Sequence, residues 1–558
     1  MERDDLRERE KRAGIPIVVG VTGHRRLRPQ DVPQLRELVA EELKKLRSMA
    51  PDSEFVVLSS VASGADTICA EEALALGIPL ICALPMPAET YRQTFAPAEL
   101  PRLDALLAAA AEVFVVRAAE PEPPAEDRHF RYRQASIYVA AHSHVLLALW
   151  DGAPGKPGGC GTAEAVGFAL HGGWEGAEAC LKSPYEGAVV HITAPREGAA
   201  YDGALASELL EEEPGSLRRV LKTTNGFNRA AGARGGADAR SALVPPECLE
   251  HSSPALRRVH ALNRTAAALS RECQKKYMRA MGAFSLFGVL LILFFLLYDE
   301  LDSNLFLIFY GALLGVYVAV FFHVRRRGAH AGYLRWRMLT EALRVQFYLL
   351  ASGSAENVGA FFTWTQRQES AWVKAALAAL LIGPVPERTV PDDVLRDVWI
   401  DGQLAYHRAA GGRDAGSMRV NETVSLVMLF CSLALFLAVL VTEFCFAPSM
   451  EIVCFRLTTP FPLLHGEAAI TLRALFKILL GIVSGVTAFL SNYYGKLSFE
   501  RKSLDHARMT ALYAAAKARY ADGSVPHERL FAELAREEII ENGNWVSYCR
   551  ENTPSFNV

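Results

Sequence analysis

HSHVLLALWDGAPGKPGGCGTAEAVGFALH, residues 142–171, contains the pattern that decides the fold of this chain. A strand-like run, residues 144–150, leads into a glycine loop, residues 157–162, and then into a helix-like run, residues 164–171. Glycine lets the backbone approach phosphate oxygens closely, and a helix N-terminus presents unpaired N–H groups to an anion. The pattern therefore predicts a phosphate site at the end of a strand. The loop residues expected there are Gly158, Gly159, Gly161 and Thr162.

Apolar runs alternate with amphipathic stretches from residue 14 to about residue 195. The apolar runs span residues 15–21, 55–58, 78–84, 113–116, 145–150 and 188–192. The amphipathic stretches include residues 31–49, 66–76, 102–111 and 130–142. Such alternation favours a parallel sheet covered by helices on both faces. We therefore predict an α/β, Rossmann-like domain, in which ligands bind beyond the carboxyl ends of the strands.

Two more strands end in residues suited to a nucleotide. The first strand ends in GVTGHR, residues 20–25, and the second is followed by SGAD, residues 63–66. Three such exits can converge at one edge of a parallel sheet, and this convergence predicts a ligand site there. The candidate residues from these two exits are Gly20, Thr22, Gly23, His24, Arg25, Ser63, Gly64 and Asp66.

Several of these side chains have a second interpretation. Arg25 can pair with a phosphate through two hydrogen bonds, or it can be a surface arginine like its neighbours. His24 can contact the ligand, or cap and pack. Asp66 can contact a ribose hydroxyl, although the simpler role is N-cap of the helix that follows it. Thr162 can cap its helix or donate its hydroxyl to the phosphate.

Composition narrows the class of ligand. The 558 residues carry a net charge of -3, so no basic excess points to direct binding of nucleic acid. Ten cysteines occur without CxxC pairs or histidines at zinc spacing, so neither a metal site nor a disulfide framework is expected. Cys445 and Cys454 are the exception, because they lie between two apolar segments where an oxidising outer face would permit a bridge.

Four apolar segments indicate a membrane protein. Residues 281–297, 305–324, 424–442 and 478–494 each approach the roughly 20 residues that a helix needs to cross the hydrocarbon. The charged residues 1–12 do not resemble a signal peptide. Basic residues flank the same side of both hairpins, namely Lys275, Lys276, Arg279, Arg325, Arg326, Arg327, Lys496, Arg501 and Lys502. The excess of positive charge places the N-terminal domain and the C-terminus in the cytoplasm.

The two hairpins contain an internal repeat. Leu305, Phe306, Ile308, Gly311, Gly315 and Val316 recur 170 positions later as Leu475, Phe476, Ile478, Gly481, Gly485 and Val486. Chance similarity between apolar strings is the alternative. Each copy holds a GxxxG motif, Gly311 with Gly315 and Gly481 with Gly485, which lets two helix backbones approach closely within a bilayer. The two motifs can pack within a hairpin, between hairpins or between chains. Packing within one chain is the simplest of these interpretations.

The expected division of the chain follows from these patterns. It is a nucleotide-binding domain over residues 1–196, a linker rich in Gly, Ala, Ser and Pro over 197–254, a first membrane unit over 255–350, a helical connector over 351–400, a second membrane unit over 401–535 and a tail over 536–558.

The strand exits resemble a known superfamily. GxTGHR at 20–25, SGAD at 63–66 and PGGxGT at 157–162 are together similar to the SLOG superfamily, which includes the Lonely Guy phosphoribohydrolases and the DNA-processing protein A family. The hairpins with their following charged helices, residues 333–350 and 504–520, resemble the SLATT family of two-helix membrane effectors. Members of these families are associated with bacterial nucleotide-signalling conflict systems.

The resemblance implies a sensor of a nucleotide second messenger fused to a membrane effector. The implied ligand is a nucleotide or an ADP-ribose derivative, made by an upstream enzyme. Ligand binding is then expected to drive homo-oligomerisation or rearrangement of the spans and to permeabilise the bacterial inner membrane in an antiviral, abortive response. No cofactor and no catalytic residue is expected.

An enzyme remains the main alternative. In the phosphoribohydrolases the motif continues as PGGxGTxxE, and its glutamate works with an upstream arginine to cleave an N-glycosidic bond. Ala165 stands at that position here. Glu164 lies one residue earlier, about 100° around the helix, so it suits a hydrogen bond to a ribose hydroxyl better than catalysis. Arg131 and Arg133 are candidates for the upstream arginine or are solvated helix charges. A regulated channel or scaffold with a vestigial site is a further alternative.

Overall fold

A computed structural model describes residues 14–117, 127–155, 159–173, 182–234, 242–301, 304–354, 356–384, 388–445, 452–458, 467–497 and 499–551. The chain forms two compact units. The first contains Met1–Leu269, Trp336–Leu395 and Gly523–Ser547, and the second contains Ser270–Arg335, Arg396–Asp522 and Tyr548–Val558.

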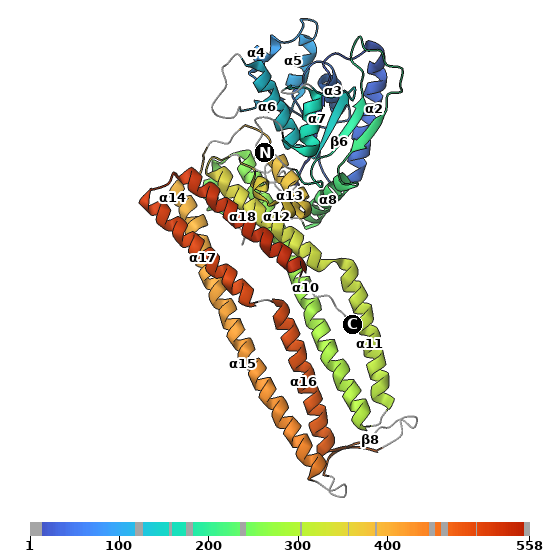
Figure 1. Cartoon of the computed structure of the whole chain (residues 1–558), viewed down its shortest axis with the longest axis vertical. Coiled ribbons are helices and arrows are strands. Elements are labelled where there is room, and N and C mark those ends of the chain that lie inside the picture. Colours follow the sequence, from blue (N-terminus) through green and yellow to red (C-terminus); the bar gives the residue numbers. More distant parts are fainter. Residues whose placement is uncertain are drawn as a thin grey trace. The chain divides into compact units, whose positions relative to one another are not determined.

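A seven-stranded sheet lies at the centre of the first unit (Figure 1). Its strands are β1 (Ile17–Gly23), β2 (Phe55–Ser59), β3 (Leu80–Leu84), β4 (Glu112–Val115), β5 (Val145–Trp150), β6 (Val189–Thr193) and β7 (Ser207–Leu210), in the order β4-β3-β2-β1-β5-β6-β7. All neighbouring pairs are parallel except β6 with β7. The parallel Rossmann-like sheet expected from the sequence is therefore confirmed. The antiparallel edge strand β7 was not expected.

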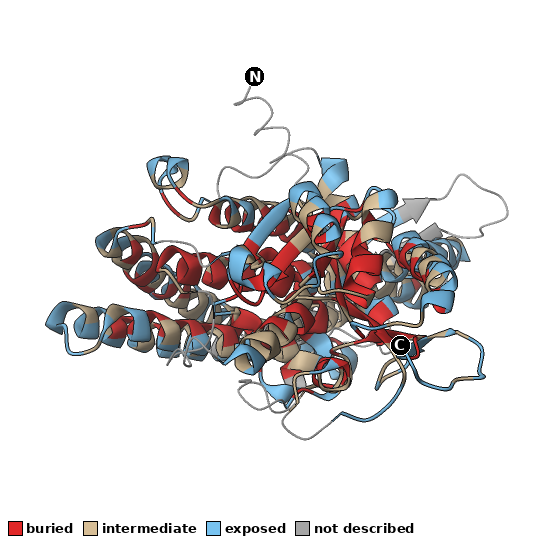
Figure 2. Ribbon diagram, turned by 90° about the horizontal axis from the view of Figure 1, so that it is seen from above, coloured by how far each residue is buried: buried red, intermediate tan, exposed pale blue. Residues whose placement is uncertain are grey.

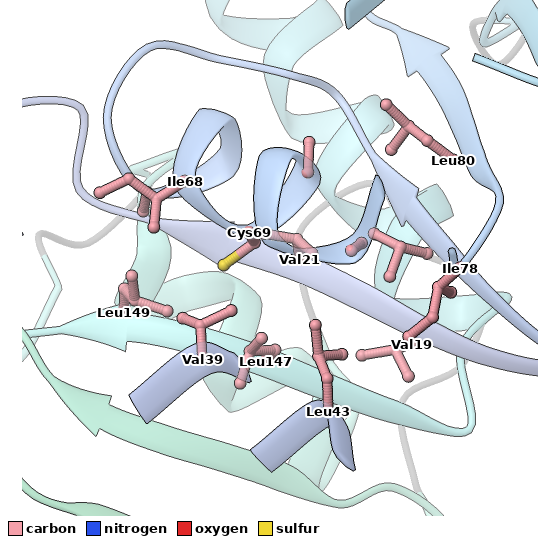
Figure 3. Close-up of a cluster of buried hydrophobic side chains, with 14 of the residues drawn as sticks. Val19, Val21, Val39, Leu43, Ile68, Cys69, Ile78, Leu80, Leu147 and Leu149 are labelled. Carbon is pink, nitrogen blue, oxygen red and sulfur yellow. The ribbon is translucent and has the colours of Figure 1, made fainter. Parts of the chain in front are cut away.

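Helices cover both faces of the sheet, because alternate side chains of each strand point to opposite faces. Val19 belongs to the first core, to which α2 (Val32–Met49), α3 (Ala65–Ala75), α5 (Leu100–Ala109) and α8 (Ser216–Arg234) contribute. Figure 3 shows the part of this core that contains Val19, with Val39 and Leu43 of α2 and Ile68 of α3. Val18, which precedes Val19 in β1, belongs to the second core, with α6 (Arg128–Ala141), α7 (Thr162–His171) and α13 (Trp364–Leu380). Figure 2 shows buried residues along the strands.

Residues 197–254, expected to form a linker, contain β7, α8 and α9 (Pro246–Glu250). The amide of Asn228 on α8 accepts a hydrogen bond from Ile15 N–H at 2.8 Å and donates to Ile15 O at 2.9 Å. Ring contacts continue the packing, with centroids 5.6 Å apart for Phe227 and Trp336 and 5.9 Å apart for Trp336 and Trp372. The prediction of a linker was therefore wrong for α8, whose buried residues recur at helical spacing within a segment rich in Gly, Ala, Ser and Pro.

The remaining elements of the first unit are short helical turns and parts of three longer helices. They are η1 (Pro29–Asp31), α4 (Ala88–Arg92), η3 (Val358–Phe361), α14 (Asp392–Leu395), the part of α10 (Pro254–Leu301) as far as Leu269, the part of α12 (Ala329–Ala351) from Trp336 onward, and α18 (His527–Glu551) as far as Ser547. Arg344 of α12 forms an ion pair with Glu538 of α18, whose side chain is 4% exposed. A buried ion pair thus connects these two helices.

The second unit is built mainly from long apolar helices. They are the end of α10 (Pro254–Leu301), α11 (Asn304–Arg327), a π-helical turn (Arg396–Asp401), α15 (Gly402–Phe444), α16 (Leu472–Leu497) and α17 (Phe499–Asp522). Three helical stretches are long and apolar enough to cross a membrane, namely Pro254–Leu301, Asn304–Ala351 and Asp392–Phe444. The fourth expected segment, residues 478–494, lies in α16, and its role as a span stays a prediction.

The two GxxxG motifs have different surroundings. A Cβ atom on Gly481 would lie 2.5 Å from Leu296 Cδ1, and one on Gly485 would lie 2.6 Å from Ile292 Cδ1, so α16 packs against α10 of the other hairpin. No described atom of another segment lies within 4 Å of the corresponding position on Gly311 or Gly315. The second motif therefore packs between hairpins within one chain.

The loop between α15 and α16 contains an antiparallel pair, β8 (Val453–Thr458) and β9 (Glu467–Thr471). The sequence did not indicate these strands. Cys445 and Cys454 are both free thiols, so the bridge that we considered between them is not formed.

Candidate functional site

The strand order creates a switch point between β1 and β5. From β1 the chain proceeds through β2 and β3 to β4 on one side, and α6 then returns it to β5 on the other side of β1. Ligands on open α/β sheets bind beyond the carboxyl ends of the strands at such a point. The three predicted exits follow β1, β2 and β5, so all of them open toward this edge. Thr22 pairs with Ala148 in the last part of β1.

Three candidate glycines are required by the packing of the protein itself. A Cβ on Gly23 would lie 2.3 Å from Ala65 Cβ. Gly64 has φ +83°, and its Cβ would lie 2.4 Å from Arg25 O and 2.5 Å from His24 O. These contacts bring the start of α3 against the end of β1, where Ala65 N–H donates to His24 O at 3.0 Å. Ser63 lies in the turn before Gly64.

The third glycine of this kind is Gly20. Its Cβ would lie 2.3 Å from Ser143 Oγ, in the turn between α6 and β5. Glycine therefore lets this turn approach the middle of β1. The need for glycine at positions 20, 23 and 64 does not by itself point to a phosphate.

His24 connects the exits of β1 and β5 to the loop after β6. Its Nε2 accepts hydrogen bonds from Asp151 N–H and Arg196 Nε, each at 3.2 Å. Asp151 Oδ1, 3.1 Å from the same nitrogen, would suit a protonated ring. Burial lowers the pKa of His24 and outweighs the opposite effect of Asp151, so we assign the neutral ring. His24 is therefore a packing residue in this state.

Asp151 and Arg196 were missed by sequence reasoning. Arg196 Nε lies 2.9 Å from Asp151 Oδ2, and Ala153 N–H donates to Asp151 Oδ1 at 3.0 Å. Burial favours a higher pKa for Asp151, but these hydrogen bonds, His24 and Arg196 hold the pKa below its ordinary value. The position of Asp151 directly after a buried strand was the one available signal.

Asp66 does not cap its helix, as the simpler interpretation expected. The helix begins at Ala65, and Asp66 Oδ2 reaches back to accept hydrogen bonds from Ser59 Oγ at 3.2 Å and Ala62 N–H at 3.3 Å. Burial raises the pKa of Asp66 to about 6, against the lowering effects of these bonds and of Arg25. A buried carboxyl at a strand exit with a raised pKa is a functional-site candidate.

The glycine loop leads into α7, whose N-terminus is capped by a side chain of the same helix. Gly158 lies outside the described residues, and Gly159 lies in the described part of the loop. Gly161 is the N-cap of α7, which begins at Thr162, so Thr162 is not the cap. Glu164 Oε2 accepts the Gly161 N–H at 3.0 Å. The carboxylate of Glu164 thus lies at the helix N-terminus where an external anion was expected.

Three charged candidates act electrostatically on the thiol of Cys160. His129 Nδ1, on α6, lies 3.4 Å from Cys160 Sγ. Burial raises the pKa of this thiol, Arg133 and Arg25 lower it, and Glu164 raises it. Arg25, Arg133 and Glu164, from three segments, are thus all near enough to act electrostatically on this thiol, as is Asp127. Two of these side chains supply the positive charge that a phosphate requires.

Ala165 has a structural role at the position of the phosphoribohydrolase glutamate. It is 1% exposed and packs in the second core with Val166, Phe168 and Ala169. A carboxylate at this position would be directed into an apolar core. Among the described residues, no cluster of three His, Cys, Asp or Glu side chains could hold a metal ion. No protein-family model and no curated protein matches this chain.

Proposed function

We propose that this chain is a membrane effector whose Rossmann-like domain senses a nucleotide. The observation that carries the proposal is that Arg25 and Arg133 both act electrostatically on Cys160, in the loop before α7 that follows β5, in a chain with three candidate membrane spans. Two arginines beside a helix N-terminus suit a phosphate. The SLOG-like and SLATT-like motifs favour a second messenger over a metabolic nucleotide.

The proposed output is permeabilisation of a bacterial inner membrane in an antiviral response. The ligand is a messenger such as a cyclic or linear ADP-ribose derivative or a cyclic oligonucleotide, produced by an upstream enzyme. A ligand shifts a population only by its different affinities for two states, so binding would rearrange or oligomerise the spans. The proposed arrangement has four spans, with both termini in the cytoplasm.

Sensing is favoured over hydrolysis by Ala165. A glycosidic bond is cleaved by carboxyl groups placed beside it, and the position used by the phosphoribohydrolases is here a buried alanine. Glu164 is engaged with Gly161 at the N-terminus of its own helix. The proposal therefore assigns binding, and no cleavage, to this site.

Dye leakage from liposomes containing the full chain tests the proposal. We expect leakage only when a nucleotide from a panel of ADP-ribose, cyclic ADP-ribose, AMP and cyclic dinucleotides is added. Arg25→Ala should abolish the response, and Arg26→Ala, which changes the neighbouring exposed arginine, should keep it. No leakage with any nucleotide, in protein that is folded and inserted, would contradict the proposal. Release of free base from AMP would instead favour the hydrolase, and leakage that ignores every nucleotide would favour a channel with a vestigial site.

A further inference from the structure

Three side chains that follow β1, β2 and β3, together with one from α6, form a group that we call the tyrosine cluster. It consists of Arg25, Asp66, Tyr91 on α4 and Tyr132 on α6. The ring centroids of Tyr91 and Tyr132 are 6.4 Å apart, and the Arg25 guanidinium carbon lies 4.8 Å from the Tyr132 centroid. The cluster adjoins the Cys160 site, because Arg25 acts electrostatically on both Asp66 and Cys160.

The hydroxyl of Tyr91 is buried without a partner. Tyr91 is 1% exposed, and its hydroxyl forms no hydrogen bond within the described part of the chain. Leaving a buried hydroxyl unsatisfied costs about 1–3 kcal/mol. The fold does not need this oxygen, because the ring is already held edge-on by Phe95 at a centroid distance of 5.0 Å. Burial also raises the pKa of Tyr91, so the hydroxyl keeps its proton and can donate it to a hydrogen bond.

Asp66 offers a second polar group to the same place. Both of its hydrogen bonds use Oδ2, and Oδ1 accepts none from the described residues. The carboxyl is near enough to act electrostatically on Tyr91. A carboxylate there would repel a phosphate, whereas a neutral group with both a donor and an acceptor would fit.

We propose that the tyrosine cluster binds the nucleobase of the ligand, with Tyr91 and Asp66 contacting its polar edge and with Tyr132 providing an aromatic plane for stacking. This inference rests on the proposed nucleotide site, in which Arg25 and Arg133 hold the phosphate. Planar bases stack on aromatic rings and on guanidinium groups, and their edges present hydrogen-bond donors beside acceptors. The bound base would satisfy the Tyr91 hydroxyl that the protein leaves unpaired.

Tyr91→Phe in the full chain provides the test, with AMP, ADP-ribose, ribose 5-phosphate and inorganic phosphate as probes. We expect about a tenfold loss of affinity for AMP and ADP-ribose, and no change for ribose 5-phosphate or phosphate, by titration calorimetry. The melting temperature without ligand should stay equal or rise, because phenylalanine removes only the unpaired oxygen. Tyr138→Phe is the matched control, since the Tyr138 hydroxyl accepts the Gly383 N–H at 3.1 Å and its removal should lower the melting temperature.

The outcomes separate this inference from the function on which it rests. If the wild type binds AMP and the Tyr91→Phe variant binds it equally well, the hydroxyl holds only a trapped water and the inference is wrong, while the nucleotide site stands. If the wild type binds AMP no better than ribose 5-phosphate, no base is recognised and the inference is also wrong. If it binds none of the four probes or any other nucleotide of the panel, the proposed function itself fails.

Discussion

The carboxylate of Glu164 occupies the N-terminus of its own helix, with Oε2 accepting the Gly161 N–H at 3.0 Å. A Cβ on Gly155 would lie 2.3 Å from Glu164 Oε1, so the loop before the helix also closes onto this carboxylate. An anion that approached the same N–H group would meet a negative charge already in place. Glu164 therefore competes with a phosphate instead of assisting it.

Glu164→Gln should consequently bind phosphate more tightly than the wild type. Removal of one negative charge at a helix N-terminus is worth about 0.3–1 kcal/mol, or roughly two- to fivefold in affinity. Calorimetric titration with inorganic phosphate and ADP-ribose measures the change, and Glu37→Gln, at an exposed position on α2, controls for net charge. A large loss of affinity for ADP-ribose in Glu164→Gln would show that Glu164 contacts the ligand directly, as the ribose interpretation requires.

Asp66 should make the stability of the protein fall between about pH 4 and pH 6. Its pKa rises from 3.8 to about 6 in the folded state, chiefly through burial. The folded state then binds more protons than the unfolded state in this window, so stability decreases as pH rises through it. Above pH 6 the buried, ionised carboxylate lowers the free energy of unfolding by about 3 kcal/mol. Asp66→Asn should therefore melt at a higher temperature than the wild type at pH 7.5 and at a similar one near pH 4. Parallel melting profiles of the two proteins would refute this.

Gly64→Ala should destabilise the first unit far more than Gly77→Ala. Both glycines have positive φ angles, +83° and +69°, and alanine in this region costs about 1–2 kcal/mol. Only at Gly64 would the added Cβ also meet backbone atoms, and no atom lies within 4 Å of it at Gly77. The melting temperatures of the two variants measure the difference. Equal decreases would mean that the backbone at the contact between β1 and α3 can shift to accept a Cβ at little cost.

Glu538→Ala should loosen α18 from α12. The Glu538 side chain is 4% exposed and pairs with Arg344, so its removal should cost about 3 kcal/mol. Glu533→Ala on the same helix removes a pair with Arg529 whose side chains are 63% and 73% exposed, and it should cost less than about 1 kcal/mol. Limited proteolysis within α18, together with melting temperature, reports the difference. Similar proteolysis of both variants would show that the Arg344–Glu538 ion pair does not hold α18 against α12.

Leucine at both Gly481 and Gly485 should weaken the packing of α16 on α10, because Leu296 and Ile292 occupy the space that the new side chains need. At Gly311 and Gly315 no described atom of another segment lies within 4 Å of an added Cβ, so leucine has more room there. The first pair should therefore lower the melting temperature in lipid nanodiscs, and the second should not. Equal losses from both pairs would mean that the two motifs pack in equivalent ways.

Periodicity predicted the framework of the molecule well. The buried runs of β1 and β5 and the amphipathic α2 and α6 lie within a few residues of their expected positions, because a short apolar strand and a 3.6-residue period leave direct marks on a sequence. β7 and α8 were not predicted because their segment is rich in Gly, Ala, Ser and Pro, although α8 carries buried residues at helical spacing, such as Leu217 and Leu221. Their places depend on tertiary partners such as Ile15, which holds Asn228.

The sequence predicted where the candidate site lies better than it predicted what each of its residues does. Strand exits could be found from glycines, but whether Gly64 serves a ligand or the backbone of Arg25 depends on contacts far apart in the sequence. Asp151, Arg196 and Tyr91 carry no motif, and only the fold places them beside the exits. Glu164 was identified as a site residue, yet its bond to Gly161 N–H depends on a rotamer that no spacing specifies.

The second core of the sheet contains Ala379 from α13, and Ile382 packs against it, although both follow the first apolar hairpin in the chain. During synthesis all seven strands, together with α6 and α7 that cover this face, therefore emerge before α13. Domains generally fold as they leave the ribosome, so the second core can form first and receive α13 only after the first apolar hairpin has been made. A chain whose synthesis stops before that hairpin would keep most of this core and lack only the contribution of Ala379 and Ile382.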